Sequence, residues 1–182
     1  MNKFYVFLDV SGVLNNYTWF QLYKDKNLNK KDYDRLICPY NLKTLNELLN
    51  KIEINGFEPI IVITSALRLL YYKKITQLLI KNNINYSGKF YETSNSNNNI
   101  RGLDISQFIE KNSIKENYVV VDDEINNIVP HIPHSHIIKA SGMLKGGLTT
   151  DNIYPFIYGE LKLIKNKFEN ESMNEKTLEE IR

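Results

Sequence analysis

Short apolar runs alternate along this chain with stretches in which apolar residues recur every three or four positions. The runs indicate buried strands, and the recurring pattern indicates amphipathic helices. We predict strands at 3–8, 58–63, 84–90, 117–121 and 135–139, and helices at 39–52, 67–82, 102–112 and 150–167. Strands that alternate with helices favour a parallel sheet with right-handed crossovers. The expected fold is therefore α/β, a three-layer sandwich around a central parallel sheet.

Two segments stand outside this alternation. The polar and aromatic stretch at 15–36 is too long for a plain connection, so we predict an insertion there. No segment is long enough for a large separate cap domain, which indicates an open site suited to a bulky substrate. With 182 residues, we expect one domain over 1–167. An acidic tail at 168–182 follows it, as a short helix or a loosely ordered segment.

The composition says more about the cellular compartment of the protein than about its chemistry. The one cysteine, Cys38, excludes an internal disulfide and is typical of a reducing compartment, so we expect a cytoplasmic, intracellular protein. Glu58 and Arg68 bracket the most apolar segment, so no membrane span is expected. The net charge of +2 is uneven, with about +6 on residues 1–90 and −4 on residues 91–182. The basic half is suited to a phosphorylated or nucleic-acid partner, although a solvated surface is the simpler interpretation.

Polar side chains follow three of the predicted strands at the point where each strand ends. Asp9 follows the first strand, Thr64 and Ser65 follow the second, and Asp122 and Asp123 follow the strand at 117–121. In a parallel sheet these ends meet at one edge, where open α/β sheets bind their ligands. Clustered carboxylates repel one another and need a cation, and oxygen ligands suit Mg²⁺. Helix caps are the alternative roles for Asp9 and Thr64.

The order and spacing of these motifs resemble the haloacid dehalogenase (HAD) superfamily. The run Asp9-Val10-Ser11-Gly12-Val13-Leu14 is similar to its first motif, Thr64 to its second and the pair Asp122-Asp123 to its fourth. Within that superfamily, the chain resembles the HAD domain of Swiss-Army-knife RNA-repair proteins. An Arg four residues after Thr64, the segment 101–105 and the run 147–149 carry this closer resemblance, which spans roughly residues 3 to 165. It implies a Rossmann-like fold, with the insertion at 15–36 as a flap beside the site.

The resemblance also implies roles for individual residues. Asp9 is the expected nucleophile, which attacks phosphorus and forms an aspartyl-phosphate. The expected Mg²⁺ ligands are Asp9, Asp122, Asp123 and the backbone carbonyl of Ser11. The expected contacts to phosphate come from Gly12, Thr64, Ser65, Arg68 and Arg101. Arg101 is our choice for the cation of the third motif, with Arg68 as its competitor.

Ser11 departs from the motif, because the usual residue two positions after the nucleophile is an aspartate. That aspartate protonates the leaving oxygen and then activates water. A serine hydroxyl does neither near neutral pH, and losing such help costs about 10²–10⁴-fold in rate. Three explanations stay open: a weakened phosphatase, a relic that only binds phosphate, or an introduced substitution.

The sequence thus favours a Mg²⁺-dependent phosphatase, a phosphoric monoester hydrolase that acts on a phosphorylated small molecule, a nucleotide, or an RNA or DNA end. A non-catalytic module that binds phosphate or nucleic-acid ends through the same pocket is the alternative. Hydrolysis of a carbon–halogen bond also uses an aspartate nucleophile. It needs no metal, so the acidic pair argues against it.

Overall fold

Five parallel strands form the central sheet of the computed structural model, which describes residues 2–25, 37–94 and 100–180. Their order across the sheet is β3-β2-β1-β4-β5. The strands are β1 (Asn2–Leu8), β2 (Phe57–Ile63), β3 (Tyr91–Glu92), β4 (Tyr118–Asp122) and β5 (Ile137–Lys139). All four neighbouring pairs run parallel. The predicted α/β fold with a central parallel sheet is confirmed.

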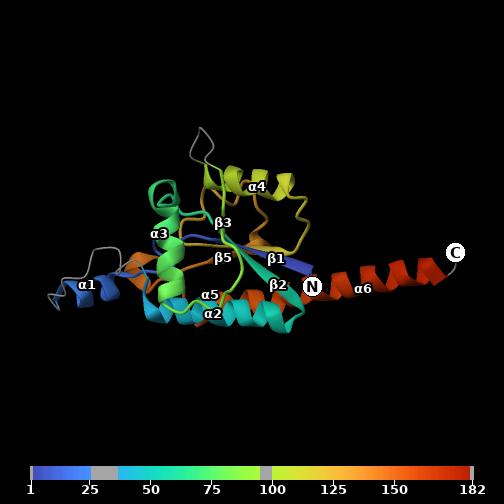
Figure 1. Cartoon of the computed structure of the whole chain (residues 1–182), viewed down its shortest axis with the longest axis horizontal. Coiled ribbons are helices and arrows are strands. Elements are labelled where there is room, and N and C mark those ends of the chain that lie inside the picture. Colours follow the sequence, from blue (N-terminus) through green and yellow to red (C-terminus); the bar gives the residue numbers. More distant parts are fainter. Residues whose placement is uncertain (1, 26–36, 95–99, 181–182) are drawn as a thin grey trace.

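Helices cover both faces of this sheet (Figure 1). The covering helices are α2 (Pro39–Ile54), α3 (Arg68–Lys81), α4 (Arg101–Lys111), α5 (Thr150–Pro155) and the first part of α6 (Leu161–Glu180), whereas α1 (Tyr17–Asp25) lies to one side of the sheet. One apolar core packs leucines of α2 and residues of α5 and α6 against one face, and includes Phe4 and Ile61 of the sheet. A second core packs Ile105 of α4 against Phe7 and Val120 on the other face. Alternate strand residues thus point to opposite layers, as the period of a strand requires.

The strand predicted at 84–90 is wrong, and the edge strand β3 is only Tyr91–Glu92. The tyrosine hydroxyl of Tyr86 accepts the N–H of Ile61 at 3.4 Å and donates to the carbonyl of Lys89 at 2.7 Å. A side chain therefore stands beside β2 where a pairing backbone was expected. The apolar residues of this segment are buried in the core without forming a ladder.

The helix predicted at 150–167 is interrupted in the structure, and helical conformation continues beyond its predicted end. Pro155 has no N–H to donate and ends α5, and residues 156–160 form a π-helical turn before α6 begins. The backbone of α6 then continues to Glu180, so the helical conformation extends into the acidic tail (Figure 1). In α3, Tyr71 leaves helical geometry at φ −132° and ψ 16°, which separates the first turn from the rest of the helix.

The predicted flap at 15–36 is described only in part. Its first half contains α1, whereas residues 26–36 lie outside the described residues. The division into a domain at 1–167 and a tail at 168–182 stays a prediction.

Candidate active site

The carboxyl ends of β1, β2 and β4 lie next to one another because these strands are parallel and in register. Leu8 is opposite Ile63 on one side and Val121 on the other. The N–H of Asp9 donates to the carbonyl of Val121 at 3.0 Å, and the N–H of Thr64 donates to the carbonyl of Leu8 at 2.9 Å. Backbone hydrogen bonds therefore hold the polar residues of the three strand ends together.

Three carboxylates meet at this edge. One oxygen from each of Asp9, Asp122 and Asp123 lies within 4.8 Å of the other two. Asp9 and Asp122 are 2% and 0% exposed, and Asp123 is half-buried. The structure thus brings together the acids that the sequence placed after two separate strands.

Within the described part of the chain, Arg101 is the cation that faces these acids. Its Nη1 lies 3.3 Å from Oδ2 of Asp9 and also contacts Oδ2 of Asp122. Burial opposes the charge of Arg101, but Asp9 and Asp122 outweigh that effect and raise its pKa. Arg101 begins α4, so this helix places the guanidinium at the carboxyl edge of the sheet.

One arginine does not balance three acids. Burial raises the pKa of Asp122 to about 7, and the charge of Asp9 adds to the rise while Arg101 opposes it. Burial likewise raises the pKa of Asp9 against the effects of Arg101 and of a hydrogen bond from Ser65. The pKa of Asp123 is raised by burial and by Asp9. These raised pKa values indicate that, when all three acids are ionised, the described residues supply too little positive charge to neutralise them.

At the ends of β1 and β2, two buried oxygens have no hydrogen-bond partner among the described residues. They are Oδ1 of Asp9 and Oγ1 of Thr64. A buried polar atom without a partner costs about 1–3 kcal/mol, so a bound group is expected to satisfy both. Carboxylate oxygens with a deficit of positive charge are suitable ligands for Mg²⁺. A threonine hydroxyl beside them is a suitable donor to a phosphate oxygen. The residues present therefore suit both groups.

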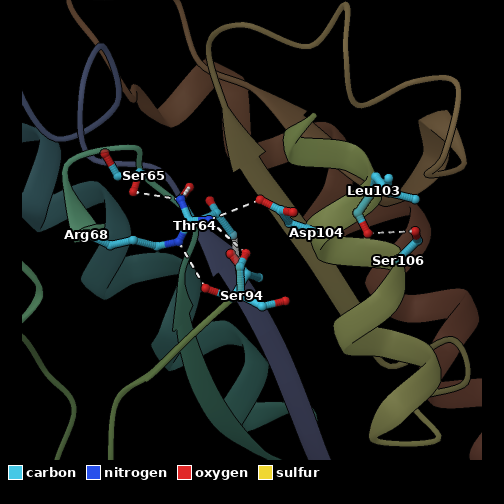
Figure 2. Close-up of polar contacts among 8 residues, drawn as sticks. Thr64, Ser65, Arg68, Ser94, Leu103, Asp104 and Ser106 are labelled. Atoms are coloured by element: carbon cyan, nitrogen blue, oxygen red, sulfur yellow. Dashed lines mark hydrogen bonds and ion pairs between the residues drawn. The ribbon is translucent and has the colours of Figure 1, made fainter. Parts of the chain in front are cut away.

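Arg68 has a different task from Arg101. Figure 2 shows its guanidinium between the turn at Thr64 and Ser65, the chain at Ser94, and Asp104 of α4. It donates to the carbonyls of Thr64 at 2.8 Å and Ser65 at 3.0 Å, and to that of Ser94 at 2.9 Å. Its Nη2 also pairs with Asp104 at 3.1 Å. Arg68 therefore clamps the Thr64–Ser65 turn, and a direct contact with phosphate stays a prediction.

Asp104 is the residue of this clamp that the sequence analysis missed. It is 2% exposed, and it lies on α4 one turn after Arg101. A signal for it was present in the sequence: Asp104 stands next to Ile105 in the predicted amphipathic helix. A carboxylate that is buried with such a residue requires a buried partner. The sequence did not show that the partner was Arg68.

Gly12 provides space for the acidic cluster. Its φ is +75°, and a Cβ at this position would lie 2.1 Å from Oδ2 of Asp123, so only glycine is accommodated. The N–H of Gly12 donates to Oδ1 of Asn15 at 2.8 Å. This backbone N–H therefore already has a partner, and a contact of Gly12 with phosphate stays a prediction. Gly142 of the late glycine-rich loop lies on the other side, where its ideal Cβ would be 3.3 Å from the same oxygen.

Ser11 is exposed in the turn that follows β1, two residues after the buried Asp9. No ionisable side chain of the motif stands at this position to exchange a proton with a leaving group. The role of its carbonyl as a metal ligand stays a prediction.

Among the helices that the structure describes, none has the length and apolar character needed to cross a membrane. Searches of curated proteins and of solved structures each gave no significant match.

A comparison with protein families does give a match. The family model described as the HAD domain in Swiss Army Knife RNA repair proteins matches residues 5–153, which include every residue of the acidic cluster and of the Arg68 clamp. HAD-superfamily proteins are generally phosphohydrolases, and they typically depend on Mg²⁺. The matched region covers most of the chain, and the chain therefore belongs to the family of HAD domains found in Swiss Army Knife RNA repair proteins.

Proposed function

We propose that this chain is a Mg²⁺-dependent phosphoric monoester hydrolase that uses Asp9 as its nucleophile. The observation that carries the proposal is the convergence of Asp9, Asp122 and Asp123 within 4.8 Å, beside a buried threonine hydroxyl without a partner. Membership of a superfamily that consists largely of phosphohydrolases supports it.

Asp9 carries the covalent step. Its carboxylate attacks phosphorus, a new oxygen–phosphorus bond forms, and the bond to the leaving oxygen breaks. Water then cleaves the acyl phosphate, which releases inorganic phosphate and restores the carboxylate. The attack requires the ionised form, which burial disfavours and the charge of Arg101 favours.

The metal would be held by Asp9, Asp122, Asp123 and the carbonyl of Ser11. A bound Mg²⁺ supplies positive charge that offsets the repulsion between phosphate and the carboxylates. Asp122 is kept in place by its Oδ1, which accepts the N–H of Glu124 at 2.9 Å. This hydrogen bond fixes the carboxylate before any ligand arrives.

The transferred phosphoryl group would be held by neutral donors and by one cation. The hydroxyls of Thr64 and Ser65 lie at the turn before α3, and the Arg68 clamp holds the backbone of that turn. Arg101 supplies the charge, and preorganised donors of this kind stabilise developing negative charge in the transition state.

Because it replaces the usual aspartate, Ser11 is expected to slow the turnover of substrates that have poor leaving groups. A poor leaving group needs a proton as its bond to phosphorus breaks, and a serine hydroxyl does not provide it near neutral pH. Phosphates on nucleotides or on RNA or DNA ends have such leaving groups, and we propose them as the substrate class. The exposed Ser11 is also the observation that favours the second candidate, a module that binds these ends without cleaving them.

Hydrolysis of p-nitrophenyl phosphate tests the proposal, because its phenolate leaves with little need of a proton. We expect turnover by the chain, loss of it with EDTA, and a gain of about 10²–10⁴-fold on a poor leaving group in Ser11→Asp. If neither the chain nor Ser11→Asp shows turnover, the binding module is favoured. Turnover of p-nitrophenyl phosphate that persists in EDTA would contradict the metal dependence, whereas hydrolysis of a haloacid in EDTA would favour the carbon–halogen alternative.

A further inference from the structure

A groove of about 1070 Å³ adjoins the candidate active site, between α3 and α4 and beside the edge strand β3. Its lining includes Arg68, Thr93 and Ser94. The same Arg68 holds the Thr64–Ser65 turn (Figure 2). The groove and the candidate site therefore share a wall, and nothing in the proposed reaction uses the groove.

Aromatic rings line this groove from all three elements. Tyr71 and Tyr72 come from α3, Tyr91 from β3 and Phe108 from α4. The hydroxyl of Tyr72 donates to a backbone carbonyl at 2.7 Å, which fixes that ring. Tyr91 is 38% exposed, so its ring is accessible. Accessible aromatic faces stack on nucleic-acid bases with little dependence on sequence.

The groove also carries an excess of positive charge. Its lining includes Lys73, Lys74 and Lys111 but one acidic side chain, Glu92. Arg68 is left out of this balance because Asp104 neutralises it at 3.1 Å. Outside the lining, Nζ of Lys89 lies 5.5 Å from the centre of the Tyr91 ring and adds a further cation beside it.

Lysines beside aromatic faces match a particular ligand chemistry. Single-stranded nucleic acid presents phosphates to the cations and bases to the rings. An acidic peptide would use the lysines and leave the rings unoccupied. A duplex has its base faces already stacked, so the rings would gain nothing from it.

We propose that this groove binds a single-stranded polynucleotide whose terminal phosphate lies at Asp9; the placement of that terminus rests on the proposed function. The length of α4 sets the extent of the bound segment, because this helix begins with Arg101 at the site and ends at Lys111 on the groove. At 1.5 Å per residue these positions are about 15 Å apart. With about 3.4 Å per stacked nucleotide, the groove accommodates about four nucleotides.

Binding measured without turnover tests this directly. Fluorescently labelled oligouridylates of two to eight nucleotides, without a terminal phosphate, are titrated into the intact chain. We expect affinity to rise with length up to about four nucleotides and then to level off. The corresponding duplex is expected to bind more weakly.

Two groove variants and two matched controls assign the effect to the groove. Tyr91→Ala is expected to weaken binding roughly 5- to 100-fold through the lost stacking. Lys111→Gln is expected to lower the slope of log affinity against log salt by about 0.7, one phosphate contact. The controls are Tyr158→Ala and Lys162→Gln, which are exposed near the start of α6 and do not line the groove. Both controls should bind as the unchanged chain does.

The outcome separates this proposal from the proposed function. Groove variants should hydrolyse p-nitrophenyl phosphate at the unchanged rate, since this small substrate does not reach Tyr91. If the chain fails to hydrolyse it but binds oligonucleotides through Tyr91 and Lys111, the phosphatase is excluded and the groove stands. If neither groove variant changes the affinity for oligonucleotides, or if that affinity does not depend on their length, the groove proposal is overturned. Equal displacement of the oligonucleotide by polyglutamate would overturn it too.

Discussion

Two arginines on neighbouring helices pair with buried aspartates, and their surroundings differ sharply. Arg68 uses Nε, Nη1 and Nη2 to donate five hydrogen bonds, and its charge is balanced one to one by Asp104. Arg101 instead faces Asp9 and Asp122, with Asp123 beside them. Burial lowers the pKa of Arg68 although Asp104 opposes it, whereas the acids around Arg101 overcome burial and raise its pKa.

This difference distinguishes a structural ion pair from a site prepared for a ligand. Arg68 uses all its N–H groups on acceptors within the protein, so its guanidinium has no donor left for a ligand. Around Arg101 negative charge is in excess among the described residues, and Oδ1 of Asp9 has no partner among them. The clamp therefore fixes the shape of the Thr64–Ser65 turn, and the acidic cluster supplies the chemistry.

The largest expected effect comes from Asp9→Asn. An amide is not a nucleophile towards phosphorus, so turnover of p-nitrophenyl phosphate should fall about 10⁴-fold or more. The thermal unfolding temperature without metal should not fall, because burial already penalises the charge of Asp9. Calorimetry and a phosphate-release assay measure the two effects. A variant that keeps its activity would refute Asp9 as the nucleophile.

Arg68→Met should break the clamp and cost about 3–5 kcal/mol of unfolding free energy, since it leaves Asp104 buried without its partner. Urea denaturation measures the loss. The double variant Arg68→Met with Asp104→Leu is the matched control, and it should recover part of the stability because no uncompensated charge remains. Equal stability of the single and double variants would contradict the expectation that the loss comes from Asp104 left without its partner.

Arg101→Met should act mainly on catalysis. Removing one preorganised donor from a developing negative charge costs about 10²–10³-fold in kcat. The free energy of unfolding in saturating Mg²⁺ should change less than in Arg68→Met, because the metal compensates the acids that lose Arg101. A larger loss of stability than in Arg68→Met would reverse the contrast between the two arginines.

The response of stability to pH and metal tests the acidic cluster without any substitution. Without metal, Asp122 titrates near pH 7 in the folded state and near 3.8 when unfolded, so the folded state binds the extra proton between these values. Unfolding free energy should therefore decrease as pH rises from about 4 to about 7 and then level off.

Mg²⁺ should oppose that decrease. At 100 times its dissociation constant it adds about 2.7 kcal/mol, and its affinity should rise with pH up to about 7 as protons leave the cluster. Thermal shifts at several pH values, with and without Mg²⁺, measure both trends. Asp123→Asn is the matched variant and should weaken the metal response while preserving the trend caused by Asp122. A metal response that is independent of pH would contradict the competition between proton and metal.

Much of the fold and of the acidic cluster could be predicted from local sequence. Buried strands such as 58–63 and 117–121 contain continuous apolar runs that end in polar residues, and each was found within a residue or two. The segment at 84–90 is less apolar, with Ile84, Tyr86 and Phe90 separated by polar residues and glycine, and it forms no strand. The Tyr86 hydroxyl occupies a hydrogen-bonding position of β2 there, and no local pattern signals that contact.

The sequence by itself determined the chemistry at the strand ends. Any parallel sheet brings the carboxyl ends of its strands to one edge, whatever the order of the strands. Tertiary structure decided which arginine faces the acids, since Arg68 and Arg101 are equally basic and only packing assigns each its partner. It also decided that Gly12 makes room for Asp123 and that rings and lysines from α3, β3 and α4 form one groove. These contacts join residues far apart in the chain, and sequence patterns report only neighbours within a strand or a helical turn.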